Sequence, residues 1–463
     1  MSNRPETNKQ SCPVYKKCGG CQLQNLSYPE QLEFKQRKVE KLLKRFCTVE
    51  KIIGMKTPYH YRNKVQAAFY TDKKGKIISG VYQSGSHHVV GIDSCQTEDV
   101  IADKIIVAVR KLLPSFRMTT YNEDTGKGFL RHILVKRGFA TNQIMLVLVT
   151  GTPVFPSKNN FVKAILKQFP EITTIVQNIN PYRTNLVLGD NQKVLYGKGY
   201  IEDILCGCKF RISPKSFYQI NPVQTEVLYG KAIEFANLKG NETVLDTYCG
   251  IGTIGIIAAK NGAGNVIGAE LNGDAVRDAI VNARANNLKN IRFYKADAGE
   301  FMREAADEDE KPDIVFMDPP RAGSDRKFLD SLIKMSPKKV VYVSCNPETL
   351  ARDLAYLTQN SPYKAQKIQP VDMFPHTAHI ETVVLLSQLK QKPDDYINVT
   401  IELDDMDVTS AETKVTYDEI KKYVAEHNDG MKVSNLYISQ VKRKCGIEVG
   451  KNYNLPKNED SRQ

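Results

Sequence analysis

The sequence predicts an α/β protein in which a doubly wound, Rossmann-like domain follows a separate β-rich unit. From Glu242 to Leu389, short apolar runs alternate with helix-like segments, a pattern typical of a parallel sheet covered by helices on both faces. From about Val65 to Leu205, short β-rich runs such as VQAAFY, QIMLVLV and TNLVLG are separated by Gly, Asn, Asp and Lys turns. This second pattern is typical of antiparallel pairing, so we expect two sheets of different kinds in one chain.

The chain of 463 residues is too long for one compact core, and we divide it into four parts. Near its start, EQLEFKQRKVEKLLKRF has the spacing of a basic amphipathic helix. Near its end, two helix-like stretches, the second of which carries Lys442, Arg443 and Lys444, fit a small helix-turn-helix or a packing appendage equally well. The expected parts are a basic N-terminal segment, a β-rich central domain, the doubly wound domain and a C-terminal extension, over residues 1–64, 65–205, 206–390 and 391–463.

The composition is that of an ordinary soluble globular protein, with 41% hydrophobic and 25% charged residues. No run of about 18 apolar residues occurs, and the polar start MSNRPETNKQ lacks the apolar stretch of a secretory signal. We therefore expect a cytoplasmic protein that does not bind a membrane and has no obligate protein partner.

The formal net charge of +13 is concentrated at the N-terminal end. Residues 1–76 hold 17 Lys and Arg against 6 Asp and Glu, whereas residues 391–463 hold 11 against 14. Such asymmetry is typical of a surface that attracts the phosphates of nucleic acid, although a merely soluble basic face also explains it.

Ten cysteines in a chain without a secretory signal argue against a disulfide framework, because the cytosol keeps thiols reduced. Cys12, Cys18 and Cys21 fall in CPVYKKCGGC, and Cys95 lies inside the β-rich unit. Four thiolates alone would permit a structural zinc site. Cys345 stands at a strand end and is considered separately. The other cysteines are interpreted as structural, namely Cys47, Cys206, Cys208, Cys249 and Cys445.

The run VLDTYCGIGTIG places Gly250, Gly252 and Gly255 after a strand and before a helix, so that the backbone there can approach a ligand closely. Glu270 ends the next strand, 20 residues after Gly250, where it can bind ribose hydroxyls. This pattern also fits the dinucleotide fingerprint, so a nicotinamide enzyme stays open at this point.

Successive strands of the doubly wound domain end in polar residues, and ligands of open parallel sheets lie beyond these ends. One or two such residues would be ordinary turn residues, whereas five in register indicate an assembled site. Two prolines in DPPR also give a stiff loop that can hold a planar substrate. The five strand ends are Asp246, Glu270, Asp297, Asp318 and Cys345.

Cys345 stands at the end of a strand in VVYVSCNPETL, where Asn346 can cap the following helix and Pro347 suits its first turn. A thiol before a helix N-terminus has its thiolate favoured, which activates a nucleophile, whereas a lone cysteine is otherwise most often inert and buried. Glu381 starts the last strand in HTAHIETVVLL. If that strand is antiparallel, Glu381 faces Cys345.

These motifs together resemble the bacterial uracil-C5 RNA methyltransferases, and within them the iron–sulfur enzymes that modify large-subunit ribosomal RNA. The resemblance rests on CPVYKKCGGC, SFYQIN, DTYCGIGTIG, GAELN, DPPR, SCNP and HIETVVLL, in this order over about residues 11–388. It implies a class I methyltransferase domain that uses S-adenosyl-L-methionine, with Cys345 as nucleophile and Glu381 as general base. The implied donor-binding residues are Gln219, Tyr248, Glu270 and Asp318, with Asp297 near the adenine.

The resemblance also implies that Cys12, Cys18, Cys21 and Cys95 hold a 4Fe-4S cluster. We expect this cluster to hold the basic segment against the β-rich unit near RNA, because methyl transfer from this donor is redox-neutral. Many relatives carry an N-terminal oligonucleotide-binding barrel, and with only 11 residues before Cys12 we expect that domain to be absent.

The predicted reaction is methylation of a uridine at C5 in 23S rRNA, which makes 5-methyluridine through a covalent bond from Cys345 to C6. The same chemistry on a tRNA T-loop is the nearest alternative. An NAD-dependent oxidoreductase would not need the SCNP cysteine, and a non-catalytic RNA-binding cluster protein would not need Cys345 with Glu381.

Overall fold

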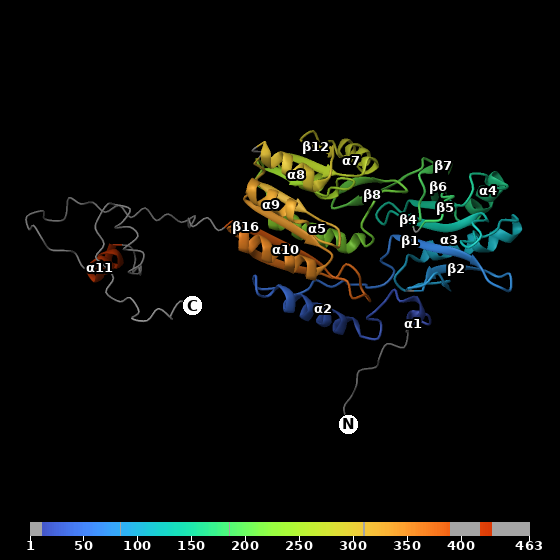
Figure 1. Cartoon of the computed structure of the whole chain (residues 1–463), viewed down its shortest axis with the longest axis horizontal. Helices are drawn as coiled ribbons and strands as arrows, with labels where there is room; N and C mark the ends of the chain where they lie inside the picture. Colours follow the sequence, from blue (N-terminus) through green and yellow to red (C-terminus); the bar gives the residue numbers. More distant parts are fainter. Residues whose placement is uncertain (1–11, 84, 185, 309–310, 389–416, 428–463) are drawn as a thin grey trace, which may run out of the picture. The chain divides into compact units, whose positions relative to one another are not determined.

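The structure is a computed structural model that describes residues 12–83, 85–184, 186–308, 311–388 and 417–427 (Figure 1). By their contacts, Met1–Gln391 form one compact unit and Lys392–Gln463 a second. The strands of the described residues and the helices α1 to α10 all belong to the first unit.

The N-terminal part of this unit consists of helix α1 (Tyr15–Cys18) and the longer helix α2 (Tyr28–Leu43). Helix α2 starts at a capping box, in which the Ser27 backbone N–H and hydroxyl each donate to Glu30 Oε2 at 2.7 Å. The predicted basic helix is thus confirmed. It buries one face, made of Gln31, Lys35, Val39 and Leu43.

The central part is a seven-stranded sheet of the described chain in the order β3-β2-β1-β4-β5-β6-β7. Five of its six strand pairs are antiparallel, and only β5 and β6 run parallel, so the predicted mostly antiparallel unit is confirmed. Helices α3 (Val100–Ser115) and α4 (Lys158–Gln168) belong to this part. The strands are Lys64–Thr71, Ile77–Tyr82, Val89–Gly91, Leu130–Arg137, Ile144–Thr150, Ile172–Ile179 and Asn191–Tyr196 for β1 to β7.

One predicted strand of this part is wrong, because the described residues of the run TNLVLG form an irregular loop before β7. The Asn180 side chain donates to the carbonyl groups of Leu186 at 2.7 Å and Val187 at 3.2 Å. Arg131 in turn donates to the Asn180 carbonyl at 2.7 Å. The backbone of the loop is therefore satisfied by side chains rather than by a neighbouring strand, which β-propensity alone does not reveal.

A hairpin of β8 (Ile201–Leu205) and β9 (Cys208–Ile212) precedes the doubly wound part. The doubly wound sheet has the order β12-β11-β10-β13-β14-β16-β15 within the described residues, and β10 to β14 are parallel. Only β15 and β16 are antiparallel to their neighbours. The strands are Thr243–Asp246, Asn265–Glu270, Ile291–Lys295, Ile314–Met317, Lys339–Ser344, Tyr363–Val371 and Glu381–Gln388 for β10 to β16.

Helices follow these strands in alternation, which confirms the predicted fold class (Figure 1). Helix α5 precedes β10 and contacts β14, β15 and β16, while α7 contacts β12 and the hairpin strand β9. The helices are Pro222–Ala236, Thr253–Lys260, Gly273–Ala285, Ala298–Asp307, Arg326–Met335 and Pro347–Asn360 for α5 to α10.

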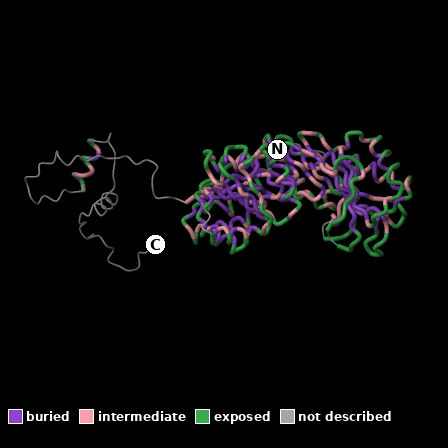
Figure 2. Tube along the Cα trace, turned by 90° about the horizontal axis from the view of Figure 1, so that it is seen from above, coloured by how far each residue is buried: buried purple, intermediate pink, exposed green. Residues whose placement is uncertain are grey.

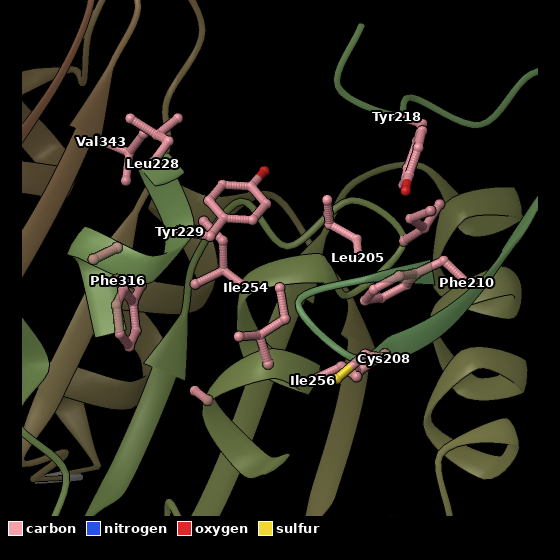
Figure 3. Packing of buried hydrophobic residues seen from close by; sticks show 14 of the residues in the cluster. Leu205, Cys208, Phe210, Tyr218, Leu228, Tyr229, Ile254, Ile256, Phe316 and Val343 are labelled. Atoms are coloured by element: carbon pink, nitrogen blue, oxygen red, sulfur yellow. The ribbon is translucent and has the colours of Figure 1, made fainter. Parts of the chain in front are cut away.

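The hydrophobic core runs from the central sheet through the hairpin into the doubly wound sheet. The buried interior of both parts appears in Figure 2. In Figure 3, Leu205 and Phe210 of the hairpin lie in the same cluster as Ile254 of α6 and Phe316 of β13. Met145 of the central sheet belongs to this cluster as well. Burial of such side chains stabilises by about 1.5–3 kcal/mol each, so the hairpin joins the two sheets firmly.

Helix α11 (Tyr417–His427) corresponds to the first helix predicted in the C-terminal extension. The second predicted helix, with Lys442, Arg443 and Lys444, lies outside the described residues. Among the described residues, no helix combines the length and apolarity needed to cross a membrane.

Candidate active site

Residues that are far apart in the sequence meet at one edge of the doubly wound sheet. Strand β10 ends at Asp246, β11 at Glu270 and β14 at Ser344. Strand β16 starts at Glu381 at the same edge, because it is antiparallel and its Thr382 pairs with Ser344. The predicted meeting of strand ends at this edge is thereby confirmed for Asp246, Glu270 and the end of β14.

The loop after β10 needs glycine at the positions that the sequence singled out. Gly250 has φ 54° and Gly252 φ 82°, a conformation that disfavours side chains. A Cβ atom on Gly252 would lie 2.8 Å from the ring of Phe293, and one on Gly255 would lie 3.1 Å from Asp246 Oδ2. Glycine is therefore required here by the backbone conformation and by close packing against Phe293 and Asp246.

A cavity opens beside the glycine loop. Gln219, Tyr248, Glu270 and Asp318 all line it, together with Asp246. The structure thus brings together the four residues that the resemblance assigns to donor binding. They come from four different segments of the chain, so folding alone assembles the cavity.

Three carboxyl groups make this cavity acidic. Asp246 Oδ2 accepts from the Gly255 backbone at 2.8 Å, while its buried Oδ1 has no partner. Burial raises the pKa of Asp246 and of Asp318 to about 7 each. Glu270 Oε2 accepts from the Gly250 backbone at 3.1 Å. Closely spaced acidic groups with a free acceptor fit a cationic ligand, as the sulfonium and ammonium groups of S-adenosylmethionine would provide.

Asp297 does not line the cavity. Its Oδ1 atom accepts from the backbone N–H groups of Gly299 at 2.9 Å and Glu300 at 3.1 Å, and it caps the N-terminus of α8. The structure thus gives Asp297 a capping role, and the expected role beside an adenine stays a prediction.

Cys345 follows directly on β14, and the register of β14 with β16 places it across from Glu381. Asn346 caps α10, because its Oδ1 accepts from the Glu348 backbone at 3.1 Å. The thiol therefore stands between a strand and a capped helix, as expected. Glu381 is 4% exposed, so its carboxyl is shielded from water.

The electrostatics of this pair differ from the expectation. Burial raises the pKa of Cys345 to about 11, and the carboxyl groups of Glu381 and Asp318 add to the rise, while Arg321 opposes it. Burial together with Asp318 also raises the pKa of Glu381 well above its usual range, again opposed by Arg321. In the free protein, burial and the two carboxyls favour the thiol, and the predicted favouring of the thiolate by the helix stays a prediction.

Sequence reasoning missed three residues at this edge. Arg321 of DPPR acts on the charges of both Cys345 and Glu381, and its side chain lies 3.5 Å from His379. Phe217 lines the cavity with 64% of its surface exposed, as an aromatic group that can stack on a base does. Their signal was present in DPPR, HIE and SFYQIN, where only neighbouring residues were singled out.

The four cysteines expected to hold a cluster line one common cavity, although Cys95 comes from a different segment than Cys12, Cys18 and Cys21. Burial, with smaller contributions from the other three thiols, raises the pKa of Cys21 to about 12. Among the described residues, no group of three or more His, Cys, Asp or Glu side chains lies close enough together to hold a metal ion. The cluster stays a prediction.

Comparison with known sequences gives consistent matches. Residues 176–389 match the model of the tRNA (uracil-5-)-methyltransferase family. A Bacillus cereus protein named an uncharacterized RNA methyltransferase is 44% identical over 392 residues, which cover 84% of this chain and 85% of that protein. A Listeria monocytogenes protein with the same description is 46% identical over 379 residues, or 81% and 83% of the two chains.

Comparison with solved structures points the same way. The tRNA (uracil-54, C5)-methyltransferase of Pyrococcus abyssi, solved with S-adenosyl-L-homocysteine, is 30% identical in sequence. The two structures superpose with a TM-score of 0.67 over 82% of this chain and 87% of that one.

Proposed function

The chain belongs to the family of S-adenosylmethionine-dependent RNA (uracil-5-)-methyltransferases, and from that premise we propose that it methylates C5 of a uridine in 23S rRNA through a covalent bond to Cys345. The observation that carries the proposal is the meeting of Cys345 and Glu381 beside the acidic cavity at one sheet edge. A nicotinamide enzyme needs neither residue there, and the relatives are RNA methyltransferases.

The residues of the cavity fit the methyl donor, which supplies a methyl group on a sulfonium centre when it is bound. Asp246 and Asp318 offset its positive charges, Glu270 accepts from its ribose hydroxyls, and the orphaned Oδ1 of Asp246 offers a further acceptor. Gln219 and Tyr248 complete the wall. Positive charge in the cavity also lowers the pKa of the nearby Cys345 thiol, because it offsets Asp318.

Cys345 provides the nucleophile that the reaction requires. C5 of uracil is too poor a nucleophile to accept a methyl group unaided. Addition of the Cys345 thiolate to C6 forms an S–C bond and moves the electron pair of the C5–C6 double bond towards C5 and O4. C5 can then take the methyl group as the bond from that methyl to the sulfonium sulfur breaks, which leaves S-adenosylhomocysteine. The uridine must leave its stack to expose C6, and Phe217 stands at the cavity to receive it.

Glu381 completes the reaction as the base. Its carboxylate removes the proton from C5, the C5–C6 double bond forms again, and the S–C bond to Cys345 breaks. Burial raises the pKa of Glu381, so its carboxylate holds a proton more strongly than an exposed one would, which suits a base. Arg321 opposes that rise in pKa and so favours the charged carboxylate, which is the form that accepts the proton.

We further propose that Cys12, Cys18, Cys21 and Cys95 hold a 4Fe-4S cluster. Four thiols from two segments around one cavity fit the donor set of such a cluster, and the spacing C-x5-C-x2-C resembles that of the iron–sulfur members of the family. A cluster would tie the N-terminal segment to the β-rich part. It enters no step of methyl transfer, which is redox-neutral.

The tRNA T-loop is the second candidate substrate, since the Pyrococcus abyssi enzyme is a tRNA methyltransferase. Mass mapping of 23S rRNA and tRNA from a deletion strain separates the two. Loss of a 5-methyluridine from 23S rRNA that returns with the wild-type gene supports the proposal, whereas loss from tRNA alone overturns the choice of substrate.

A further inference from the structure

The segment that leads into Glu381, residues 372–380, is called the base loop here. Its backbone is held from outside at five consecutive carbonyl groups. Three of the five donors belong to the N-terminal segment before β1, so that segment fixes the approach to Glu381. The donors are Gln224 to Asp372 at 3.0 Å, Asn221 to Met373 at 2.9 Å, Lys35 to Phe374 at 3.0 Å, Tyr61 to Pro375 at 3.0 Å and the Leu23 backbone to His376 at 3.0 Å.

A buried ion pair joins α2 to the start of the base loop. Lys35 Nζ lies 2.6 Å from Asp372 Oδ1, and both side chains are fully buried. The second oxygen, Asp372 Oδ2, accepts from the Tyr28 hydroxyl at 2.9 Å. Such a pair contributes little net stability against an apolar alternative, but it does fix one geometry because no other arrangement satisfies both charges.

A second contact clamps the middle of the base loop. His376 has φ 69°, a left-handed conformation that costs a side chain about 1–3 kcal/mol and persists where its surroundings determine it. Gln31 Oε1 accepts from the His376 backbone at 2.8 Å, and Gln31 Nε2 lies 3.2 Å from His376 Nδ1. His376 Nε2 lies 2.9 Å from the Pro58 carbonyl. These partners indicate a neutral ring protonated at Nε2, so one side chain of α2 holds both ring and backbone.

The cysteine-rich end of the chain reaches the same loop. Besides the bond from Leu23 to His376, the Ala378 backbone donates to Gln22 Oε1 at 3.2 Å. Gln22 and Leu23 follow directly on Cys21, and the part of the chain from Cys12 to Leu23 is called the cysteine segment here. The base loop is thus bound by the cysteine segment and by α2 within a few residues of Glu381.

We propose that Gln31 and Lys35 are positioning residues, which hold the base loop so that Glu381 stands correctly for proton removal. The inference rests on the proposed roles of Cys345 and Glu381. It gives the N-terminal segment a part in product release in addition to the RNA binding expected from its charge.

The test is the lifetime of the covalent enzyme–RNA adduct in the full-length variant Gln31→Met. Methionine keeps the volume of Gln31 but loses both contacts to His376. Attack by Cys345 and methyl transfer precede proton removal, so the variant should form the adduct normally and release product about 10- to 100-fold more slowly. Affinity for S-adenosylmethionine should not change, since the cavity residues are elsewhere.

Gln36→Met is the matched control, because Gln36 lies on the same helix and bonds to Glu50 and Ile52 instead of the base loop. It should release product at the wild-type rate. If Gln31→Met lacks a cooperative thermal transition, Gln31→Glu takes its place, since that variant keeps the acceptor for the His376 backbone but not the donor to the ring.

The outcomes separate the two proposals. Wild-type release by the folded Gln31 variant, or equally slow release by Gln36→Met, overturns the positioning role alone. If wild-type protein forms no adduct with 5-fluorouridine RNA and Cys345→Ala retains turnover, the proposed function fails, and the positioning role with it.

Discussion

The doubly wound sheet and the N-terminal segment reach the same site by different routes. In the sheet, Asp246, Glu270 and Asp318 lie at the edge because each ends a strand or directly follows one, so local pattern places them. In the N-terminal segment, Lys35 and Gln31 reach the base loop through contacts that span more than 300 residues of sequence. The difference teaches that the chemistry of this site is encoded locally, whereas its alignment is encoded by long-range contacts. Substitutions in the two regions should therefore fail in different ways.

The largest effect is expected at the nucleophile in the sheet. Cys345→Ala removes the thiol proposed to attack C6, and methylation should fall on the order of 10⁴-fold or more. Donor affinity should stay close to wild type, because the cavity is lined by other residues. Transfer of labelled methyl groups to RNA, alongside calorimetric donor binding, measures both. Substantial turnover by this variant would rule out the covalent route.

The base comes next, with a different signature. Glu381→Gln should still attack and methylate, but it should release product about 10²- to 10⁴-fold more slowly because proton removal from C5 precedes elimination. A protein–RNA adduct should accumulate on denaturing gels. Free turnover at the normal rate would remove Glu381 from the mechanism.

In the N-terminal segment, a substitution should mainly lower the stability of the fold. Lys35→Met leaves the buried Asp372 carboxylate without its cation, and the free energy of unfolding should fall by about 3–5 kcal/mol. The matched control is Lys38→Met on the same helix, whose pair with Glu348 is partly exposed and should cost only about 0–1 kcal/mol. Equal losses in denaturant unfolding would contradict the structural role of the buried pair.

The cysteine segment offers a further contrast. Anaerobically purified wild type should contain about four iron and four sulfide per chain, and Cys18→Ser should lose them. RNA affinity should then fall, and each lost phosphate contact should flatten its salt dependence by about 0.7–0.9 in slope. Donor affinity should be preserved. Zinc in place of iron would overturn the cofactor assignment, and loss of donor binding with RNA binding kept would overturn the proposed role.

The smallest effect is expected from pH on donor binding in the sheet. The pKa values of Asp246 and Asp318 are raised to about 7 in the free protein, so both hold protons below that pH. A cationic donor favours the carboxylates, and its affinity should rise with pH between 6 and 8, up to about tenfold per pH unit for each proton released. S-adenosylhomocysteine lacks the sulfonium and should show a weaker dependence. An affinity independent of pH would mean that these carboxyls do not face the charge.

The same contrast explains what the sequence could predict. Strand ends and the glycine loop follow from period and composition, so Asp246, Glu270, Asp318, Cys345 and Glu381 were placed correctly at one edge. The capping role of Asp297 was missed, because an Asp that caps a helix and an Asp that binds a ligand give the same sequence pattern at this position. The raised pKa of Cys345 was missed because burial and neighbouring carboxyls are properties of the folded site.

The N-terminal segment shows what could not be predicted from the sequence. Its basic helix was predicted, yet nothing in the pattern of α2 indicates that Lys35 is buried against Asp372. A lysine in a basic helix normally suggests solvent or phosphate. The strand predicted at TNLVLG failed for a related reason, because the Asn180 side chain binds the backbone of this run and Arg131 in turn holds Asn180.

The central claim is the covalent bond between Cys345 and C6 of a uridine, and one measurement tests it most directly. Wild-type protein is incubated with S-adenosylmethionine and 23S rRNA fragments that carry 5-fluorouridine, which has no C5 proton for Glu381 to remove. The adduct is then digested and mapped by mass spectrometry. The account predicts a peptide containing Cys345 linked to a methylated 5-fluorouridine. An adduct on another cysteine, or no adduct while the normal RNA is methylated, would contradict it.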